Sequence, residues 1–143
     1  MDPEVTKLSE AKTQAGNYFV SNYPPYSFWT EDRVGEAFEA LDRPPAPNTP
    51  LGVYLHIPFC RKRCRFCYFK VYTEKDANEI ENYLKAATRE LELYTAKRFI
   101  GERKPTFIYF CGGTPSYISS RQLSGLTRRM KELLPWDAAQ EIT

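Results

Sequence analysis

The sequence of 143 residues lacks the features that mark membrane, nucleic-acid-binding and secreted proteins. No apolar run approaches the ~18 residues that a membrane-spanning helix needs. The 20 Lys and Arg residues are balanced by 18 Asp and Glu, and a net charge of +2 gives no support for nucleic-acid binding through charge. The chain begins Met-Asp-Pro-Glu, which is too acidic and polar for a secretory signal peptide. We therefore expect a cytoplasmic protein. In such proteins clustered cysteines bind metal or do redox chemistry more often than they form disulfides, and we expect the same of the four cysteines in this chain.

The composition divides the chain into two parts. Residues 1–50 are predicted to be a helical and proline-rich extension, with a weakly periodic helix near residues 3–20, extended chain at 22–29, and a linker that holds four prolines between Asp42 and Pro50. From residue 51 onward, apolar strand patterns alternate with amphipathic helix patterns. Strands are expected at 51–57 and 106–110, helices at about 76–98 and 119–134, and a third strand begins at 141–143.

This alternation predicts an α/β fold with a parallel sheet covered by helices. The strand at 106–110 is apolar on both faces, as expected of a buried parallel strand. A capping box is expected at Asp76, where the first long helix begins. Two strands and the beginning of a third cannot close a barrel, and a closed barrel of such units runs to ~250 residues. Residues 51–143 are therefore interpreted as the N-terminal βα units of a partial barrel, truncated at the third strand.

The chemistry-bearing motif is Cys60-Arg-Lys-Arg-Cys64-Arg-Phe-Cys67, with the spacing C-x3-C-x2-C. One interpretation is structural, because positions i, i+4 and i+7 share one face of a helix and cysteine is readily buried. A second is a zinc-binding structural domain with His56 or Cys111 as fourth ligand, although structural zinc sites usually show two separated ligand pairs. The third is an iron–sulfur cluster, since closely spaced thiolates in one loop can hold a cluster.

The iron–sulfur interpretation leaves room for a second ligand. Four thiolates would saturate a four-iron cluster, whereas three leave one iron open. Gly112 and Gly113 follow the second predicted strand, and paired glycines allow the backbone to approach a ligand closely. Because loops after consecutive parallel strands emerge at the same edge of the sheet, the cysteine loop and the glycine pair are expected to be neighbours. The motif also contains four cations, which would offset the negative charge of a cluster: Arg61, Lys62, Arg63 and Arg65.

Together these motifs resemble a known family. Tyr54-x-His56-Ile-Pro-Phe leads into the cysteine motif, and Gly112-Gly-Thr-Pro-Ser116 follows the second strand. This combination is similar to the radical S-adenosylmethionine (radical SAM) superfamily. Residues 51–143 are most similar to its oxygen-independent coproporphyrinogen III oxidases and their haem-chaperone relatives, so they would form the N-terminal part of a radical SAM core.

The resemblance implies a 4Fe-4S cluster held by Cys60, Cys64 and Cys67, with S-adenosylmethionine (SAM) chelating the open iron. An electron from a donor such as flavodoxin or ferredoxin would cleave the sulfonium to give a 5′-deoxyadenosyl radical. In the oxidases this radical starts oxidative decarboxylation of a porphyrin-type substrate, which makes them oxidoreductases. The resemblance assigns a second set of residues to the SAM pocket: Tyr54, Phe66, Tyr68, Gly112, Gly113 and Thr114.

Two positions depart from the oxidase pattern. Tyr68-Phe69 stand where the oxidases have Gly-Cys after the third cluster cysteine. A haem-binding chaperone or a radical SAM methyltransferase of the same group therefore remains an alternative, with a porphyrinogen or haem as the small-molecule ligand. Cys111 stands where the family has glycine, and we expect it to be a buried small apolar residue. The sequence identifies no residue that acts on the substrate.

Overall fold

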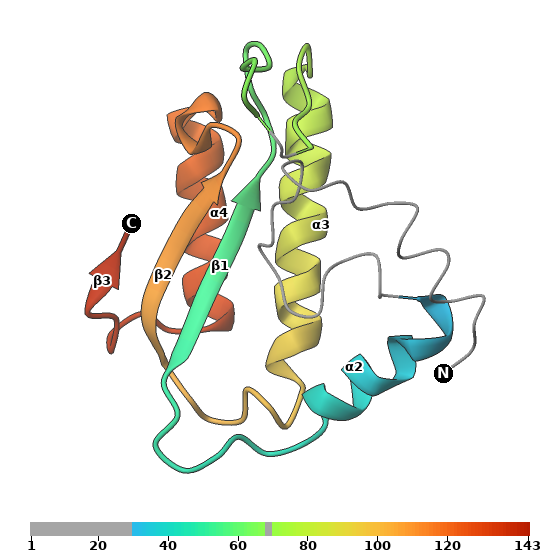
Figure 1. Cartoon of the computed structure of the whole chain (residues 1–143). Helices are drawn as coiled ribbons and strands as arrows, with labels where there is room; N and C mark the ends of the chain where they lie inside the picture. Colours follow the sequence, from blue (N-terminus) through green and yellow to red (C-terminus); the bar gives the residue numbers. More distant parts are fainter. Residues whose placement is uncertain (1–29, 68–69) are drawn as a thin grey trace, which may run out of the picture. The chain divides into compact units, whose positions relative to one another are not determined.

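The computed structural model describes residues 30–67 and 70–143 (Figure 1). The helix predicted near residues 3–20, the extended segment at 22–29 and Tyr68 lie outside the described residues. The chain divides between Ala40 and Leu41 into two units, and the boundary predicted after residue 50 remains a prediction. The first two elements that the structure describes are a 3-10 turn, η2 (Glu31–Arg33), and helix α2 (Val34–Leu41). Among the described residues, no helix is long and apolar enough to cross a membrane.

The second unit, Leu41–Thr143, alternates strands and helices. Its elements are β1 (Leu51–Ile57), α3 (Ala77–Thr95), β2 (Pro105–Gly112), the 3-10 turn η3 (Pro115–Tyr117), α4 (Ser120–Leu133) and β3 (Glu141–Ile142). The strands form a parallel sheet in the order β1-β2-β3, which confirms the predicted α/β fold. Strand β1 has its predicted bounds because proline at position 58 ends the ladder.

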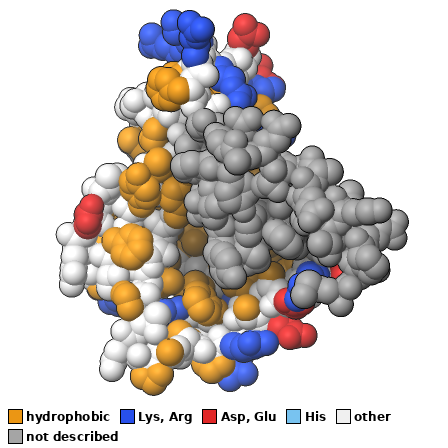
Figure 2. Space-filling view, viewed as in Figure 1, with side chains coloured by type: hydrophobic (Ala, Val, Ile, Leu, Met, Phe, Trp, Pro, Cys, Tyr) orange, Lys and Arg blue, Asp and Glu red, His pale blue; other side chains and the backbone are white. Residues whose placement is uncertain are grey.

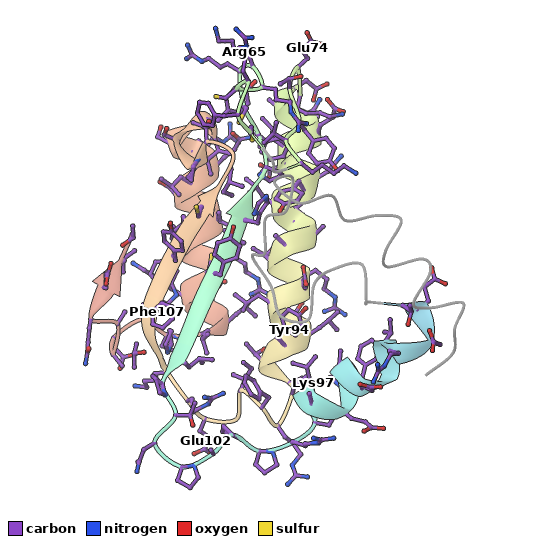
Figure 3. The ribbon with its side chains drawn as sticks, in the orientation of Figure 1. Arg65, Glu74, Tyr94, Lys97, Glu102 and Phe107 are labelled. Atoms are coloured by element: carbon purple, nitrogen blue, oxygen red, sulfur yellow. The ribbon has the colours of Figure 1, made fainter. Side chains whose placement is uncertain are left out.

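Helices α3 and α4 cover one face of this sheet (Figure 1). The buried cluster joins the end of β1 to both helices and consists of Ile57, Phe59, Ile80, Leu84, Ile118, Leu126 and Met130. On the opposite face, Phe107 and Tyr109 are 46% and 41% exposed (Phe107 is labelled in Figure 3). The expectation that this strand is buried on both faces is therefore wrong for these two residues, because no described element covers that face of β2.

Helix α3 begins at the predicted capping box, which provides a stability test. The Asp76 carboxylate accepts hydrogen bonds from the backbone N–H groups of Asn78 and Glu79, both at 2.8 Å. Asp76→Ala removes both bonds, so we expect the free energy of unfolding to fall by about 1 kcal/mol in urea denaturation. Glu81→Ala, on the exposed side of the same helix, is the control and should change it by no more than about 0.5 kcal/mol. Equal losses in both variants would contradict the capping role.

Candidate functional site

The cysteine motif lies in a loop between β1 and α3 that is closed at its base. The backbone N–H of Cys60 donates to the carbonyl of Tyr72 at 3.0 Å, and the N–H of Tyr72 donates to the carbonyl of Pro58 at 2.8 Å. Next to this closure, Phe59 is only 3% exposed and its ring meets that of Tyr83 edge-on, with 5.2 Å between centroids. The core therefore fixes both ends of the loop, and the cysteines follow directly from this fixed base.

Cys64 and Cys67 lie in the projecting part of the loop. The N–H of Cys67 donates to the carbonyl of Cys64 at 3.1 Å, and the Arg63 guanidinium donates to the carbonyl of Cys67 at 2.9 Å. Cys64 is exposed, Cys60 and Cys67 are half-buried, and none of the described cysteines forms a disulfide. The segment contains no helix. The interpretation of the three cysteines as one buried helix face is therefore wrong.

The glycine turn after β2 lies against the beginning of the cysteine loop. The N–H of Gly113 donates to the carbonyl of Ile57 at 2.8 Å, and the N–H of Thr114 donates to the carbonyl of Phe59 at 2.9 Å. A Cβ on Gly113 would lie 2.8 Å from the Sγ of Cys60. The Thr114 hydroxyl is 3.5 Å from the same sulfur. The two loops are thus neighbours at the carboxyl edge of the sheet, as the topology predicts.

Gly112 continues this close packing toward the other face of the sheet. Its φ of 119° is a conformation that side chains rarely allow, and a Cβ would lie 2.9 Å from the imidazole of His56. The Nδ1 of His56 is 2.8 Å from the hydroxyl of Tyr54. The carbonyl of His56 accepts a hydrogen bond from the Tyr83 hydroxyl at 2.8 Å. The imidazole of His56 therefore lies beside the glycine turn, and its backbone is tied to α3.

Two residues of β2 extend the site across the open face of the sheet. In the parallel register Tyr54 pairs with Tyr109 and His56 pairs with Cys111, and the two tyrosine rings are 5.8 Å apart. A hydrogen bond with the Cys111 side chain raises the pKa of Tyr109. Burial, and then the nearby Cys111, raises the pKa of Tyr54. Both phenols are therefore neutral at physiological pH, which suits polar contacts better than ionic ones.

These contacts correct one expectation and add one residue. Cys111, expected to be a buried apolar residue, is half-buried and interacts with a tyrosine hydroxyl. Tyr109 is absent from the predicted site because no motif contains it. Its position two residues before Cys111 on a strand is the available signal, since alternate residues share one face.

The predicted site residues are only partly brought together. Cys60, Gly113 and Thr114 are in contact, whereas Phe66 is 82% exposed on the projecting loop. Within residues 30–67 and 70–143, no three Cys, His, Asp or Glu side chains are gathered closely enough to hold a metal ion. The loop and η3 also border a cavity of about 410 Å³ lined by Arg61, Lys62, Thr114, Ser116 and Tyr117.

Known proteins resemble the chain in both sequence and fold, although no family model matches it. It is 33% identical over 124 residues to the oxygen-independent coproporphyrinogen III oxidase of Escherichia coli K12, covering 86% of this chain and 26% of the oxidase. It is 38% identical over 92 residues to the heme chaperone HemW of Mycobacterium tuberculosis, covering 62% of this chain and 23% of the chaperone.

A solved structure of the Escherichia coli oxidase, described as a radical SAM enzyme, aligns with 87% of this chain and 28% of its own chain. The TM-score is 0.71 at 30% identity. The chain thus spans about a quarter of the length of these relatives. Over this quarter of their length, the sequence and the parallel α/β fold confirm the chain's resemblance to the radical SAM superfamily, in the group of oxygen-independent coproporphyrinogen III oxidases and HemW haem chaperones.

Proposed function

We propose that this chain provides the iron–sulfur and SAM-binding part of a radical SAM protein that acts on a porphyrin-type substrate. The observation that carries the proposal is the close approach of Gly113 to Cys60. Because glycine has no Cβ, the turn after β2 can lie against a sulfur of the cysteine motif. A cofactor that binds between the two loops needs this arrangement, since it must touch both the metal and the backbone of the turn.

The donor chemistry of the loop fits a 4Fe-4S cluster. Cys60, Cys64 and Cys67 would hold three irons and leave the fourth for the amino and carboxylate groups of SAM. The exposed position of Cys64 leaves its sulfur accessible to metal, and a metal gathers its own ligands as it binds. When bound, the cluster would supply the electron that cleaves SAM, with flavodoxin or ferredoxin as its source.

The other predicted residues would bind and orient SAM. The backbone carbonyls of Gly112 and Gly113 would accept from its ammonium group, and Thr114 would lie beside the Cys60 ligand. Phe66 has a freely accessible ring that can pack on the adenine, and Tyr68 would contribute a second aromatic surface. The neutral hydroxyl of Tyr54, held by His56, would make a polar contact at the open face of the sheet.

For the whole protein we propose the oxidase reaction, the oxidative decarboxylation of a coproporphyrinogen-like substrate. A haem-binding chaperone is the second candidate, favoured by the 38% identity to HemW and by Tyr68-Phe69 in place of the oxidase Gly-Cys. Haem titration and a decarboxylation assay separate the two. Stoichiometric haem binding without loss of carboxyl groups from coproporphyrinogen supports the chaperone, and turnover without tight haem binding supports the oxidase.

Anaerobic reconstitution with iron and sulfide tests the shared part of the proposal. We expect a brown protein with about four irons and four sulfides per chain, because three thiolates and one exchangeable ligand complete such a cluster. Adding SAM should change the electron paramagnetic resonance spectrum of the reduced protein. A chain that binds zinc and takes up neither iron nor sulfide would instead be the zinc-binding structural domain.

A further inference from the structure

We infer that the exposed cations of the cysteine loop form the docking surface for an acidic one-electron donor protein. The surface, here called the cationic loop, consists of residues 60–67 with Arg61, Lys62, Arg63 and Arg65. The inference rests on the proposed function, because only a chain that holds a reducible group needs a donor. One electron would pass from the donor to the iron–sulfur group, so the donor is oxidised and the group reduced by one electron, and no bond forms or breaks.

Charge is concentrated on this loop although the whole chain is nearly neutral. From Pro58 to Thr73 the sequence contains five Lys and Arg residues and no Asp or Glu, whereas the net charge of the chain is only +2. Residues 61–66 are all exposed. Figure 2 shows Lys and Arg side chains gathered at the end of the molecule where Figure 3 labels Arg65. The loop is therefore a small convex patch of positive charge.

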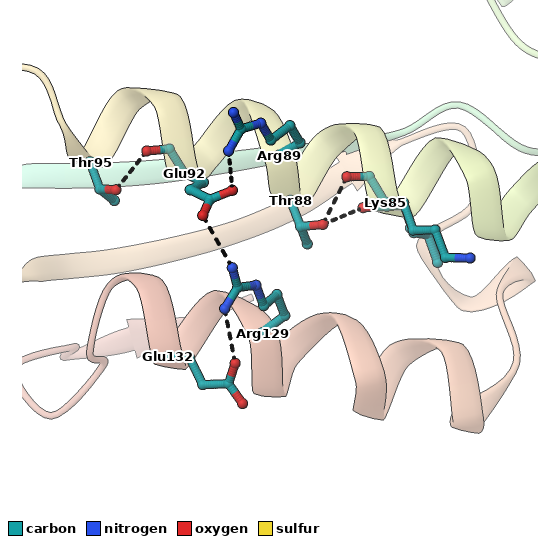
Figure 4. A network of polar contacts seen from close by, with 8 residues as sticks. Lys85, Thr88, Arg89, Glu92, Thr95, Arg129 and Glu132 are labelled. Atoms are coloured by element: carbon teal, nitrogen blue, oxygen red, sulfur yellow. Dashed lines mark hydrogen bonds and ion pairs between the residues drawn. The ribbon is translucent and has the colours of Figure 1, made fainter.

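Within the described residues, the cations of this patch have no carboxylate partner, unlike many others in the chain. Arg63 donates instead to the carbonyl of Cys67. Figure 4 shows the contrasting arrangement between α3 and α4, where Glu92 accepts from Arg89 at 2.6 Å and from Arg129 at 3.4 Å. Those charges neutralise one another. The charges of the cationic loop remain available to a partner of opposite sign.

The position of the patch favours a redox protein over a nucleic acid. The cations occupy the gaps between the cysteines, so a partner that docks on them lies directly over the sulfur atoms. Opposite charges on the loop and its partner also raise the rate of association by about 10- to 1,000-fold at low salt. A nucleic acid needs a longer positive track than the eight residues of the cationic loop provide.

The test neutralises three cations and leaves Arg63 in place because it holds the Cys67 carbonyl. The loop variant is Arg61→Gln/Lys62→Gln/Arg65→Gln. The control variant loses the same charge at three exposed positions elsewhere in the second unit, as Arg98→Gln/Arg121→Gln/Arg128→Gln. Binding of oxidised flavodoxin to the whole chain, with and without iron, is measured by calorimetry at about 10 mM and about 100 mM salt, where the Debye length falls from about 30 to about 10 Å. Stopped-flow reduction of the reconstituted chain by reduced flavodoxin is the second readout.

We expect the loop variant to lose about tenfold or more in both affinity and reduction rate at the lower salt concentration. The control variant should stay within about twofold. At about 100 mM salt, where the negative charge of dithionite is screened, dithionite should reduce both variants at the rate of the unmodified chain. Equal losses in the two variants, or a single-stranded DNA that binds as tightly as flavodoxin, would overturn the inference. A chain that never takes up iron overturns the proposed function as well. If the chain takes up iron but flavodoxin reduces the loop variant at the rate of the unmodified chain, this inference is overturned and the proposed function is not.

Discussion

Cys64→Ala should abolish iron and sulfide binding and leave the fold intact. Two thiolates cannot hold a four-iron cluster, so we expect iron to fall from about four to less than about one per chain. The side chain of Cys64 is exposed, and the loop that carries it is fixed at its base by Phe59 and Tyr72. Its loss should therefore change the free energy of unfolding by no more than about 0.5 kcal/mol. Iron and sulfide analysis after anaerobic reconstitution measures the first effect, and urea denaturation measures the second.

Cys111→Ala is the matched control for this experiment. Cys111 lies on β2 outside the C-x3-C-x2-C motif, and its side chain interacts with the hydroxyl of Tyr109. We expect this variant to keep its iron and its spectral response to SAM. If instead Cys111→Ala loses iron as fully as Cys64→Ala, then four thiolates hold the cluster. No iron would then remain open for SAM, and the proposed function fails.

Gly113→Ala should weaken both the fold and the binding of SAM. The added Cβ would lie 2.8 Å from the Sγ of Cys60, 2.8 Å from the carbonyl oxygen of Phe59 and 3.0 Å from the carbonyl carbon of Pro58. Two of these three atoms are backbone atoms, which cannot rotate away. We expect the free energy of unfolding to fall by about 1–3 kcal/mol, as in other overpacked sites. The affinity of the reconstituted chain for SAM should fall by about tenfold or more, which corresponds to about 1.4 kcal/mol.

Gly125→Ala, on α4, separates this effect from the general effect of replacing glycine. No atom outside its own helix turn lies within 4 Å of the position of the new Cβ. Because alanine is favoured over glycine inside a helix, we expect the free energy of unfolding to rise by about 0.5–1 kcal/mol. Binding of SAM should not change. If Gly113→Ala matches Gly125→Ala both in its free energy of unfolding and in its affinity for SAM, the turn does not crowd Cys60.

The elements that could be predicted from the sequence are those with a strong local signal. Strand β1 has its predicted bounds, and both long helices begin at capping boxes, Asp76 with Glu79 and Ser119 with Gln122. Helix α3 ends at Thr95, before the predicted position near residue 98. Its end carries no comparable signal, because Gly101, the next glycine along the chain and a residue type that often ends a helix, lies several residues beyond the last helical turn.

The sequence by itself determined the candidate ligands and the resemblance to radical SAM proteins, because the spacing of the cysteines and the motifs around them are properties of neighbouring residues along the chain. Only the tertiary structure decided that Gly113 touches Cys60, and that Tyr109 and Cys111 share an open face with Tyr54 and His56. These contacts join residues more than fifty positions apart. They depend on the register that pairs Ile57 with Gly112, and the sheet sets that register through the packing of both helices on its other face.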